Sequence, residues 1–151
     1  NVKVTRFRLE AQYSVPPDSK NRDEWGAGLG LWNGGSSGLN FCVRRLSEGP
    51  LAVWGSIADE DDHYEQQRLG RSSEIERGQL ALTVDGKNCV FEYRDFTAQG
   101  DEGWRKIHER KAPSEAHHPA VCPWTWGNGR VDFTLHSLRL VVLPDDPLLK
   151  P

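Results

Sequence analysis

The 151-residue chain lacks several features that would assign it to a common class. No apolar run approaches the roughly 20 residues that a membrane-spanning helix needs, and the sequence contains no signal-peptide pattern. The formal net charge is −3 and no basic block occurs, which argues against nucleic acid as a partner. We therefore expect neither membrane insertion nor nucleic-acid binding, and interpret the chain as a mature protein or an excised domain.

Cysteine is scarce, and the three residues Cys42, Cys89 and Cys122 cannot all pair with one another. A Cys42–Cys122 bridge is one alternative, and three reduced thiols are the other, which the sequence favours. Cys89 falls on the apolar side of an alternating run, where a free thiol behaves as a small hydrophobic side chain. We expect Cys89 to be buried and unreactive.

Sustained helical periodicity and internal repeats are also absent. Instead, about seven or eight alternating runs recur between turn signals, a pattern typical of two packed antiparallel sheets. The 15 glycines, nine prolines and 36% hydrophobic residues fit such a turn-rich globular protein. The chain is predicted to be an all-β, two-sheet antiparallel jelly-roll sandwich, a single domain over residues 1–143 with a tail or linker at 144–151.

The clearest pattern is QLALTVDGKNCVFEYRD, in which two alternating segments flank Asp85-Gly86. This dipeptide suits a two-residue type I′ turn. Such a turn would pair Leu82 with Cys89 across the hairpin. It would also pair Leu80 with Phe91, so that both apolar sets share one face.

Other segments are assigned from the same alternation. The first strand runs over residues 2–13 with a bulge near Thr5-Arg6, and the last, over residues 130–143, changes phase between Leu135 and Leu138. Residues 59–77 form either a helical turn or an edge strand. Residues 113–129 form a loop rich in proline, histidine and tryptophan.

Three consecutive runs, at residues 25–31, 39–45 and 51–57, are the most informative for function. If their apolar residues share the core side, the opposite side carries three rows of residues across the sheet. Glycines in a strand often mark the close approach of a ligand or of another backbone. The rows are Gly28 with Cys42 and Trp54, Gly26 with Arg44 and Ala52, and Gly30 with Asn40 and Ser56.

This face has the residue types of a sugar-binding groove. An indole such as Trp54 offers a flat apolar surface, and Arg44 and Asn40 can donate hydrogen bonds to hydroxyl groups. Trp124 and Trp126 in PWTWGNG alternate, so they would form a rim of the same groove. In the structural alternative, loops cover the face, Trp54 fills a second core layer, and the other two indoles plug one end of the sandwich.

The runs WGAGLGLWNG, GQLALTVDGKNCVFEYRD and VDFTLHSLRLVVL together resemble the concanavalin A-like lectin and glucanase superfamily, which includes laminin G-like domains. The resemblance implies a jelly roll of two curved sheets, often with carbohydrate on the concave face. The glucanases of the superfamily carry a Glu-x-Asp-x-Glu strand. Neither Glu74-Ile75-Glu76 nor Glu60-Asp61-Asp62 matches it, which argues against hydrolysis by that route.

Two further clusters have the donor types of metal ligands. The acidic run at residues 59–63 could supply oxygen ligands to calcium, but its spacing matches no EF-hand loop. His117, His118 and Cys122 have the donor types of a zinc site but offer only three candidates. No phosphate-binding loop or nucleophile elbow stands out. We therefore expect no cofactor, with calcium as the weak alternative.

These features together predict a non-catalytic carbohydrate-binding module. If the module is part of a longer chain, the other domains of that chain would be its partners. The same features favour an extracellular or cell-surface location. One alternative is a laminin G-type module that binds proteins through its loops. Solvent access to Trp54, Arg44 and Asn40 would separate these two functions. A glycoside hydrolase or polysaccharide lyase is the third possibility, which a pair of carboxylates roughly 5–9.5 Å apart in the groove would favour.

Overall fold

The computed structural model describes the strands and some of their connections. The described residues are 6–16, 25–32, 38–45, 51–57, 63–68, 76–96, 103–112, 118–121, 124–125 and 131–144. The predicted bulge at Thr5 and most of the predicted tail lie outside them. None of the described residues forms a helix, so none of them provides a helix that could span a membrane.

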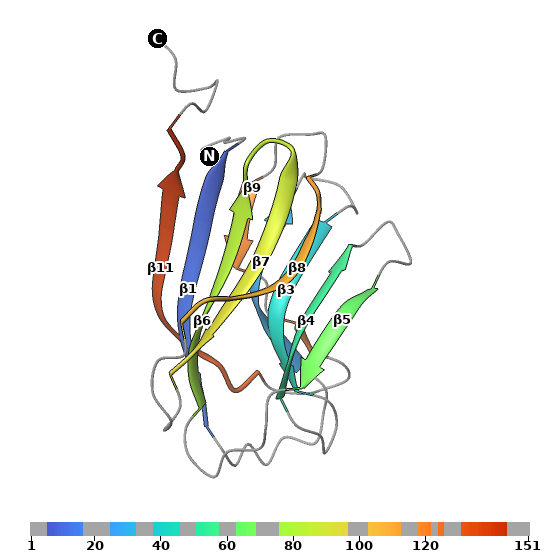
Figure 1. Ribbon diagram of the computed structural model, residues 1–151. Helices are drawn as coiled ribbons and strands as arrows, with labels where there is room; N and C mark the ends of the chain where they lie inside the picture. The colour runs from blue at the N-terminus through green and yellow to red at the C-terminus, as the bar shows by residue number, and fades with distance from the viewer. Residues whose placement is uncertain are drawn as a thin grey trace.

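Two antiparallel sheets pack face to face (Figure 1). The five-stranded sheet has the order β11-β1-β6-β7-β8, with β1 at Phe7–Val15, β6 at Glu76–Val84, β7 at Asn88–Asp95, β8 at Arg105–Lys111 and β11 at Thr134–Val142. The six-stranded sheet has the order β10-β2-β3-β4-β5, and β9 also pairs with β2. Its strands are β2 at Trp25–Trp32, β3 at Gly38–Arg45, β4 at Leu51–Ile57, β5 at His63–Arg68, β9 at His118–Val121 and β10 at Trp124–Thr125. The predicted all-β sandwich is confirmed.

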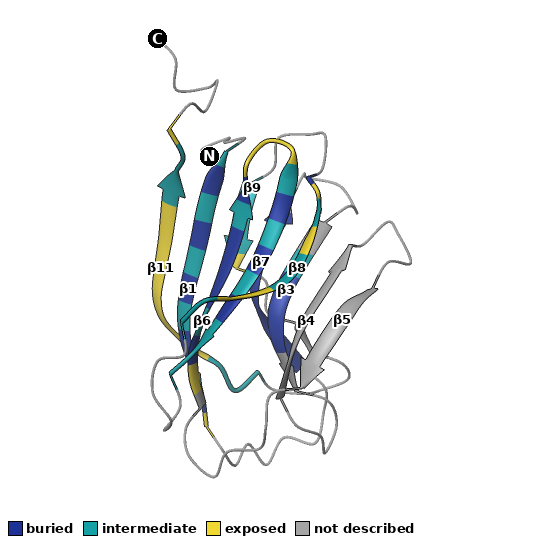
Figure 2. Ribbon diagram, viewed as in Figure 1, coloured by how far each residue is buried: buried dark blue, intermediate teal, exposed yellow. Residues whose placement is uncertain are grey.

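Alternation along the strands builds the core between the two sheets. Burial in β1 changes at every residue, which Figure 2 shows as alternating dark blue and teal bands. Phe41 of β3 and Phe91 of β7 meet edge to face across the interface, with ring centroids 5.1 Å apart. Tyr13 stacks on Phe133 at 5.3 Å near one edge of the core. Because both sheets contribute fully buried aromatic rings, neither sheet can bury its apolar face without the other.

The central hairpin forms, but the predicted register is wrong by two residues. Leu82 lies opposite Phe91, and Val84 lies opposite Cys89. The predicted buried face is nevertheless right, since Leu80, Leu82, Cys89 and Phe91 are all fully buried. A shift by two residues leaves every side chain on its own face, so alternation alone cannot detect it.

The turn lies one residue further along the chain than predicted, because the backbone N–H of Asp85 donates to the carbonyl oxygen of Asn88 at 3.1 Å and leaves Gly86 and Lys87 between them. The side chain of Asp85 supports this turn. Its Oδ1 atom accepts hydrogen bonds from the backbone N–H of Lys87 at 2.8 Å and of Asn88 at 2.7 Å. This is an Asx-type turn, in which a side chain replaces a backbone acceptor. Gly86 has a φ of 89°, in the region that favours glycine. The loop therefore holds Asp85 to Asn88 between the paired strands.

The structure tests three further assignments made from the sequence. The acidic segment contains an edge strand rather than a helical turn, since β5 pairs with β4. The predicted loop at residues 113–129 contains the short strands β9 and β10, which corrects that assignment. The predicted phase change in the last strand is confirmed, because the pairing of β1 with β11 shifts between Gln12 and Tyr13, leaving His136 between the paired Leu135 and Ser137.

The edge strand β11 exposes apolar residues on the core side of the sheet. Leu138 and Leu140 pair with the buried Ala11 and Leu9, yet they are 49% and 41% exposed. Leu135 is 39% exposed. Figure 2 shows most of β11 in yellow beside the banded β1. The described residues of the other sheet therefore leave this edge of the sandwich uncovered.

Replacing Phe91 by alanine should lower the free energy of unfolding by about 3–5 kcal/mol, because the cavity would adjoin Phe41 at the centre of the core. Urea denaturation followed by tryptophan fluorescence measures this loss. Val90→Ala is the matched control, since Val90 is a half-buried neighbour on the other face, and it should cost clearly less. A loss below about 0.5 kcal/mol for Phe91→Ala would contradict this core assignment.

A second stability prediction concerns pH. The hydrogen bonds from the N–H groups of Asn88 and Lys87 hold the pKa of Asp85 below its usual value. A carboxylate whose pKa falls on folding stabilises the protein above its unfolded pKa of about 3.9 and loses that effect as the pH falls through the folded pKa. The melting temperature of Asp85→Ala should therefore lie below that of the wild type at pH 7. This difference should shrink below about pH 4, and a constant difference down to pH 2.5 would contradict the role of the charge.

Candidate functional site

The outer face of the six-stranded sheet is the candidate site. Ala27, Leu29, Phe41 and Val43 are buried in the core, so the residues between them lie on the opposite face. The pairing of β2, β3 and β4 confirms the three predicted rows on this face. These rows are Gly28, Cys42 and Trp54; Gly26, Arg44 and Ala52; and Gly30, Asn40 and Ser56.

The short strand β10 adds a tryptophan to one row. Trp124 pairs with Gly26, so it shares a row with Arg44 on the outer face. This pairing agrees with the predicted position of Trp124 at the rim, although the contacts of its side chain stay a prediction. Trp126 lies outside the described residues, and its predicted place at the rim is untested.

The pairing also brings residues to this face that the sequence analysis did not single out. Trp32 follows Gly30 by two residues on β2, and its partner across β9 is His118. Ser56 pairs with His63 of β5, and Ala52 with Arg68. The alternation in WGAGLGLW could have revealed Trp32. The other three depend on strand pairings that the sequence does not indicate.

Carboxylates are rare on this sheet. Over the printed bounds of its six strands, the only aspartate or glutamate is Glu65. It lies in the irregular stretch of β5, where the pairing with β4 shifts between Val53 and Gly55. Tyr64 pairs with Gly55 and Gln67 with Val53, which leaves Glu65 and Gln66 opposite Trp54. The one carboxylate of these strands therefore lies beside the row of Gly28, Cys42 and Trp54.

The backbone of β3 accounts for the glycine at position 28. A Cβ atom at Gly28 would clash with the carbonyl oxygen of Phe41 and would lie 2.9 Å from the Cβ of Cys42. The sequence left open whether a ligand or another backbone approaches this glycine, and the neighbouring strand is what does so. The predicted role of Gly28 as a point of ligand approach is not needed to explain its identity.

The floor of the face is buried, and its accessibility varies along the strands. Gly26, Gly28, Gly30 and Cys42 are all buried, whereas Asn40 is half-buried. Exposure at Asn40 means that the row of Gly30 reaches solvent on β3. The side chains of Arg44, Trp54, Ser56 and Trp124 lie outside the description, so their solvent access stays a prediction.

The cysteines do not form the bridge considered above. Cys42 and Cys89 are both free thiols and both buried, which contradicts the Cys42–Cys122 alternative. Burial raises the pKa of the Cys89 thiol to about 12, so the reactive thiolate is scarce at neutral pH. The burial expected for Cys89 is confirmed. Cys122, His117 and the acidic residues 59–62 lie outside the described residues, and the zinc and calcium alternatives stay untested.

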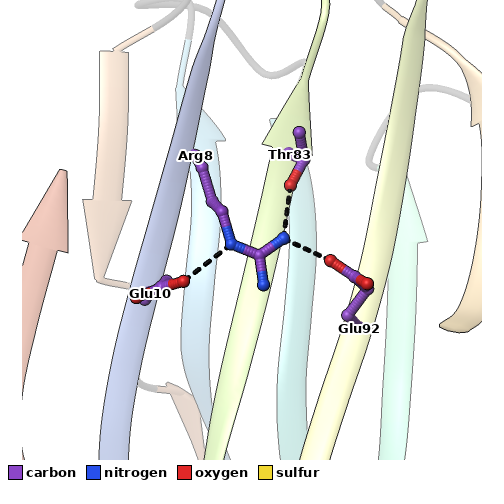
Figure 3. Close-up of polar contacts among 4 residues, drawn as sticks. All are labelled: Arg8, Glu10, Thr83 and Glu92. Carbon is purple, nitrogen blue, oxygen red and sulfur yellow. Dashed lines mark hydrogen bonds and ion pairs between the residues drawn. The ribbon is translucent and has the colours of Figure 1, made fainter. Parts of the chain in front are cut away.

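The outer face of the other sheet carries a polar cluster that the sequence analysis missed (Figure 3). Arg8 donates from Nε to Glu10 at 2.7 Å, and from Nη1 to Thr83 at 2.9 Å and to Glu92. Its guanidinium also lies 4.7 Å from the ring centroid of Trp104. All five residues occupy or flank strands of the five-stranded sheet.

The electrostatics of this cluster indicate a structural role. Burial by itself would lower the pKa of Arg8, but hydrogen bonds and charge from Glu10 and Glu92 outweigh it and raise the pKa. The partners of the guanidinium come from β1, β6 and β7, with Trp104 just before β8. The cluster therefore ties the start of β8 to the sheet. Strand alternation could have placed Arg8, Glu10 and Glu92 on one face, but not the contact with Trp104.

No protein-family model and no curated protein matches this chain. Several solved structures are similar to it at low sequence identity, and three of them are described below. A functionally unknown protein from Saccharomyces cerevisiae has a TM-score of 0.67 and 14% identity, over 94% of this chain and 72% of that one. A GH43 protein from Bacillus licheniformis has a TM-score of 0.64 and 11% identity, over 92% of this chain but only 28% of that one.

The third structure is the CBM2 module of the evolved Dit protein of Lactobacillus casei BL23 phage J-1. It has a TM-score of 0.56 and 14% identity, over 90% of this chain and 58% of that one. The shared feature is the β-sandwich. Because all three identities are below 25%, these likenesses establish the fold and no particular activity.

Proposed function

We propose that the protein is a non-catalytic carbohydrate-binding module, with its ligand on the outer face of the six-stranded sheet. The observation that carries this proposal is the pairing of β2, β3 and β4, which aligns Trp54, Arg44 and Asn40 on one face. Its similarity in fold to a CBM2 module supports the same function. A larger protein that contains this domain would supply any catalytic activity through other domains.

The chemistry of the rows suits a sugar ligand. Gly26, Gly28 and Gly30 have no side chains to project from β2 on this face. The tryptophans on either side would offer apolar surfaces to sugar C–H groups. Asn40, Arg44 and Ser56 would provide hydrogen bonds to hydroxyl groups. We expect weak binding, because a shallow surface immobilises a flexible oligosaccharide for few contacts.

The scarcity of carboxylates supports binding without turnover. Most glycoside hydrolases use a pair of Asp or Glu residues on either side of the scissile bond. The strands of this sheet contain Glu65 alone. A single carboxylate cannot fill both roles, so the strands of this face favour a binding module over a hydrolase.

The Trp54→Ala variant tests this proposal. We expect the isolated domain to retain at least one oligosaccharide on a glycan array. Fluorescence titration with that oligosaccharide should show an affinity about tenfold or more lower for Trp54→Ala, because stacking area is lost. Trp104→Phe is the matched control on the other sheet and should bind as the wild type does. Equal binding by Trp54→Ala, or no retained glycan, would contradict the proposal.

One observation favours the second candidate, a protein-interaction module. Leu135, Leu138 and Leu140 form an exposed apolar edge on β11, and such patches often contact other proteins. This edge belongs to the five-stranded sheet, away from the rows of the proposed sugar site. Leu138→Lys should therefore leave the glycan titration unchanged. Loss of glycan binding in this variant would move the ligand site to β11.

A further inference from the structure

The charges in the rows of the six-stranded sheet point to a particular class of ligand. Arg44 on β3 and Arg68 on β5 belong to the same row, because both strands pair with β4 at Ala52. Trp124 ends this row on the other side, opposite Gly26. One strand, β4, lies between the strands that carry the arginines, so two inter-strand spacings place their Cα atoms roughly 10 Å apart. Both can therefore serve one oligosaccharide.

On the five-stranded sheet, two cations among the described residues have carboxylate partners. Arg8 makes ion pairs with Glu10 of its own strand and with Glu92 of β7. Lys106 makes an ion pair with Glu109 within β8. The positive charges of Arg8 and Lys106 are therefore balanced by nearby carboxylates of the same sheet.

The row of Arg44 and Arg68 contains no carboxylate, and Glu65, opposite Trp54 in the neighbouring row, is the one carboxylate in the strands of this sheet. The neighbouring rows also contain two histidines, His63 and His118. The protein as a whole has a net charge of −3, so this concentration of basic residues runs against its overall charge. Arginine forms forked, charge-assisted hydrogen bonds with planar anionic groups.

We infer that the ligand is an anionic oligosaccharide, with carboxylate or sulfate groups that Arg44 and Arg68 recognise. This inference rests on the proposed sugar-binding function and gives the chemical class of its ligand. The tryptophans of the face would contact the sugar rings. The two arginines would make the site bind an anionic glycan in preference to a neutral one.

An array of matched glycan pairs tests the inference. Uronic acid oligosaccharides are printed beside their carboxyl-reduced forms, and sulfated oligosaccharides beside their desulfated forms. We expect retention of the charged member of at least one pair, at a signal about tenfold or more above its neutral partner. The pair that responds distinguishes carboxylate from sulfate as the recognised group.

Variants at the two arginines test their role with the glycan that responds. Arg44→Gln and Arg68→Gln should each weaken binding about tenfold or more, since each removes a charge-assisted contact. Arg139→Gln removes an exposed charge from β11 and should bind as the wild type does. Arg44→Lys keeps the charge without the fork and should fall between wild type and Arg44→Gln. The circular dichroism spectrum of each variant verifies folding.

The salt dependence of the wild type gives a measurement that needs no variant. Affinity for the charged glycan should fall as sodium chloride rises from 20 to about 500 mM, because salt screens the attraction. Equal retention of charged and neutral partners, with no effect of salt, would overturn the anionic ligand and leave the sugar-binding function standing. Retention of no glycan at all would overturn both.

Discussion

The close packing of β2 against β3 is the constraint on which the rest of the six-stranded sheet depends. Gly28 lies so near the backbone of Phe41 and Cys42 that any side chain there would clash. On the core side, Leu29 faces Phe41 and both are fully buried. A one-residue slip would move these apolar residues to the outer face, so their burial excludes that slip from the observed register. That register determines which residues share the rows of the outer face.

The two sheets divide structural and binding roles through their outer faces. On the five-stranded sheet, Arg8 binds Glu10, Thr83 and Glu92 and lies against Trp104, so its charge is used within the protein. On the six-stranded sheet, aromatic and basic residues share rows with glycines. The proposal of a ligand site on the six-stranded sheet rests on the rows that these aromatic and basic residues share.

How well each strand could be predicted depends on how strongly its alternating apolar residues limit the possible strand pairings. The register of β2, β3 and β4 agrees with the one predicted from the apolar residues that alternate in all three strands. Alternation fixes the face of each residue but does not by itself exclude a shift by two residues. The predicted register of β6 and β7 was wrong by two residues, because that shift preserves both faces and only the position of the turn distinguishes the two registers. The strands β9 and β10 were missed, since four and two residues are too few to show a period. Their pairing with β2 adds His118 and Trp124 to the candidate site.

The location of the ligand can be measured directly by nuclear magnetic resonance. Backbone amide shifts of ¹⁵N-labelled protein would be followed while an oligosaccharide selected on the glycan array is added. We predict that the largest changes fall on β2 and β3, at Gly28, Gly30 and Asn40. Changes concentrated instead around Arg8 and Glu92, or along β11, would contradict a ligand site on the six-stranded sheet.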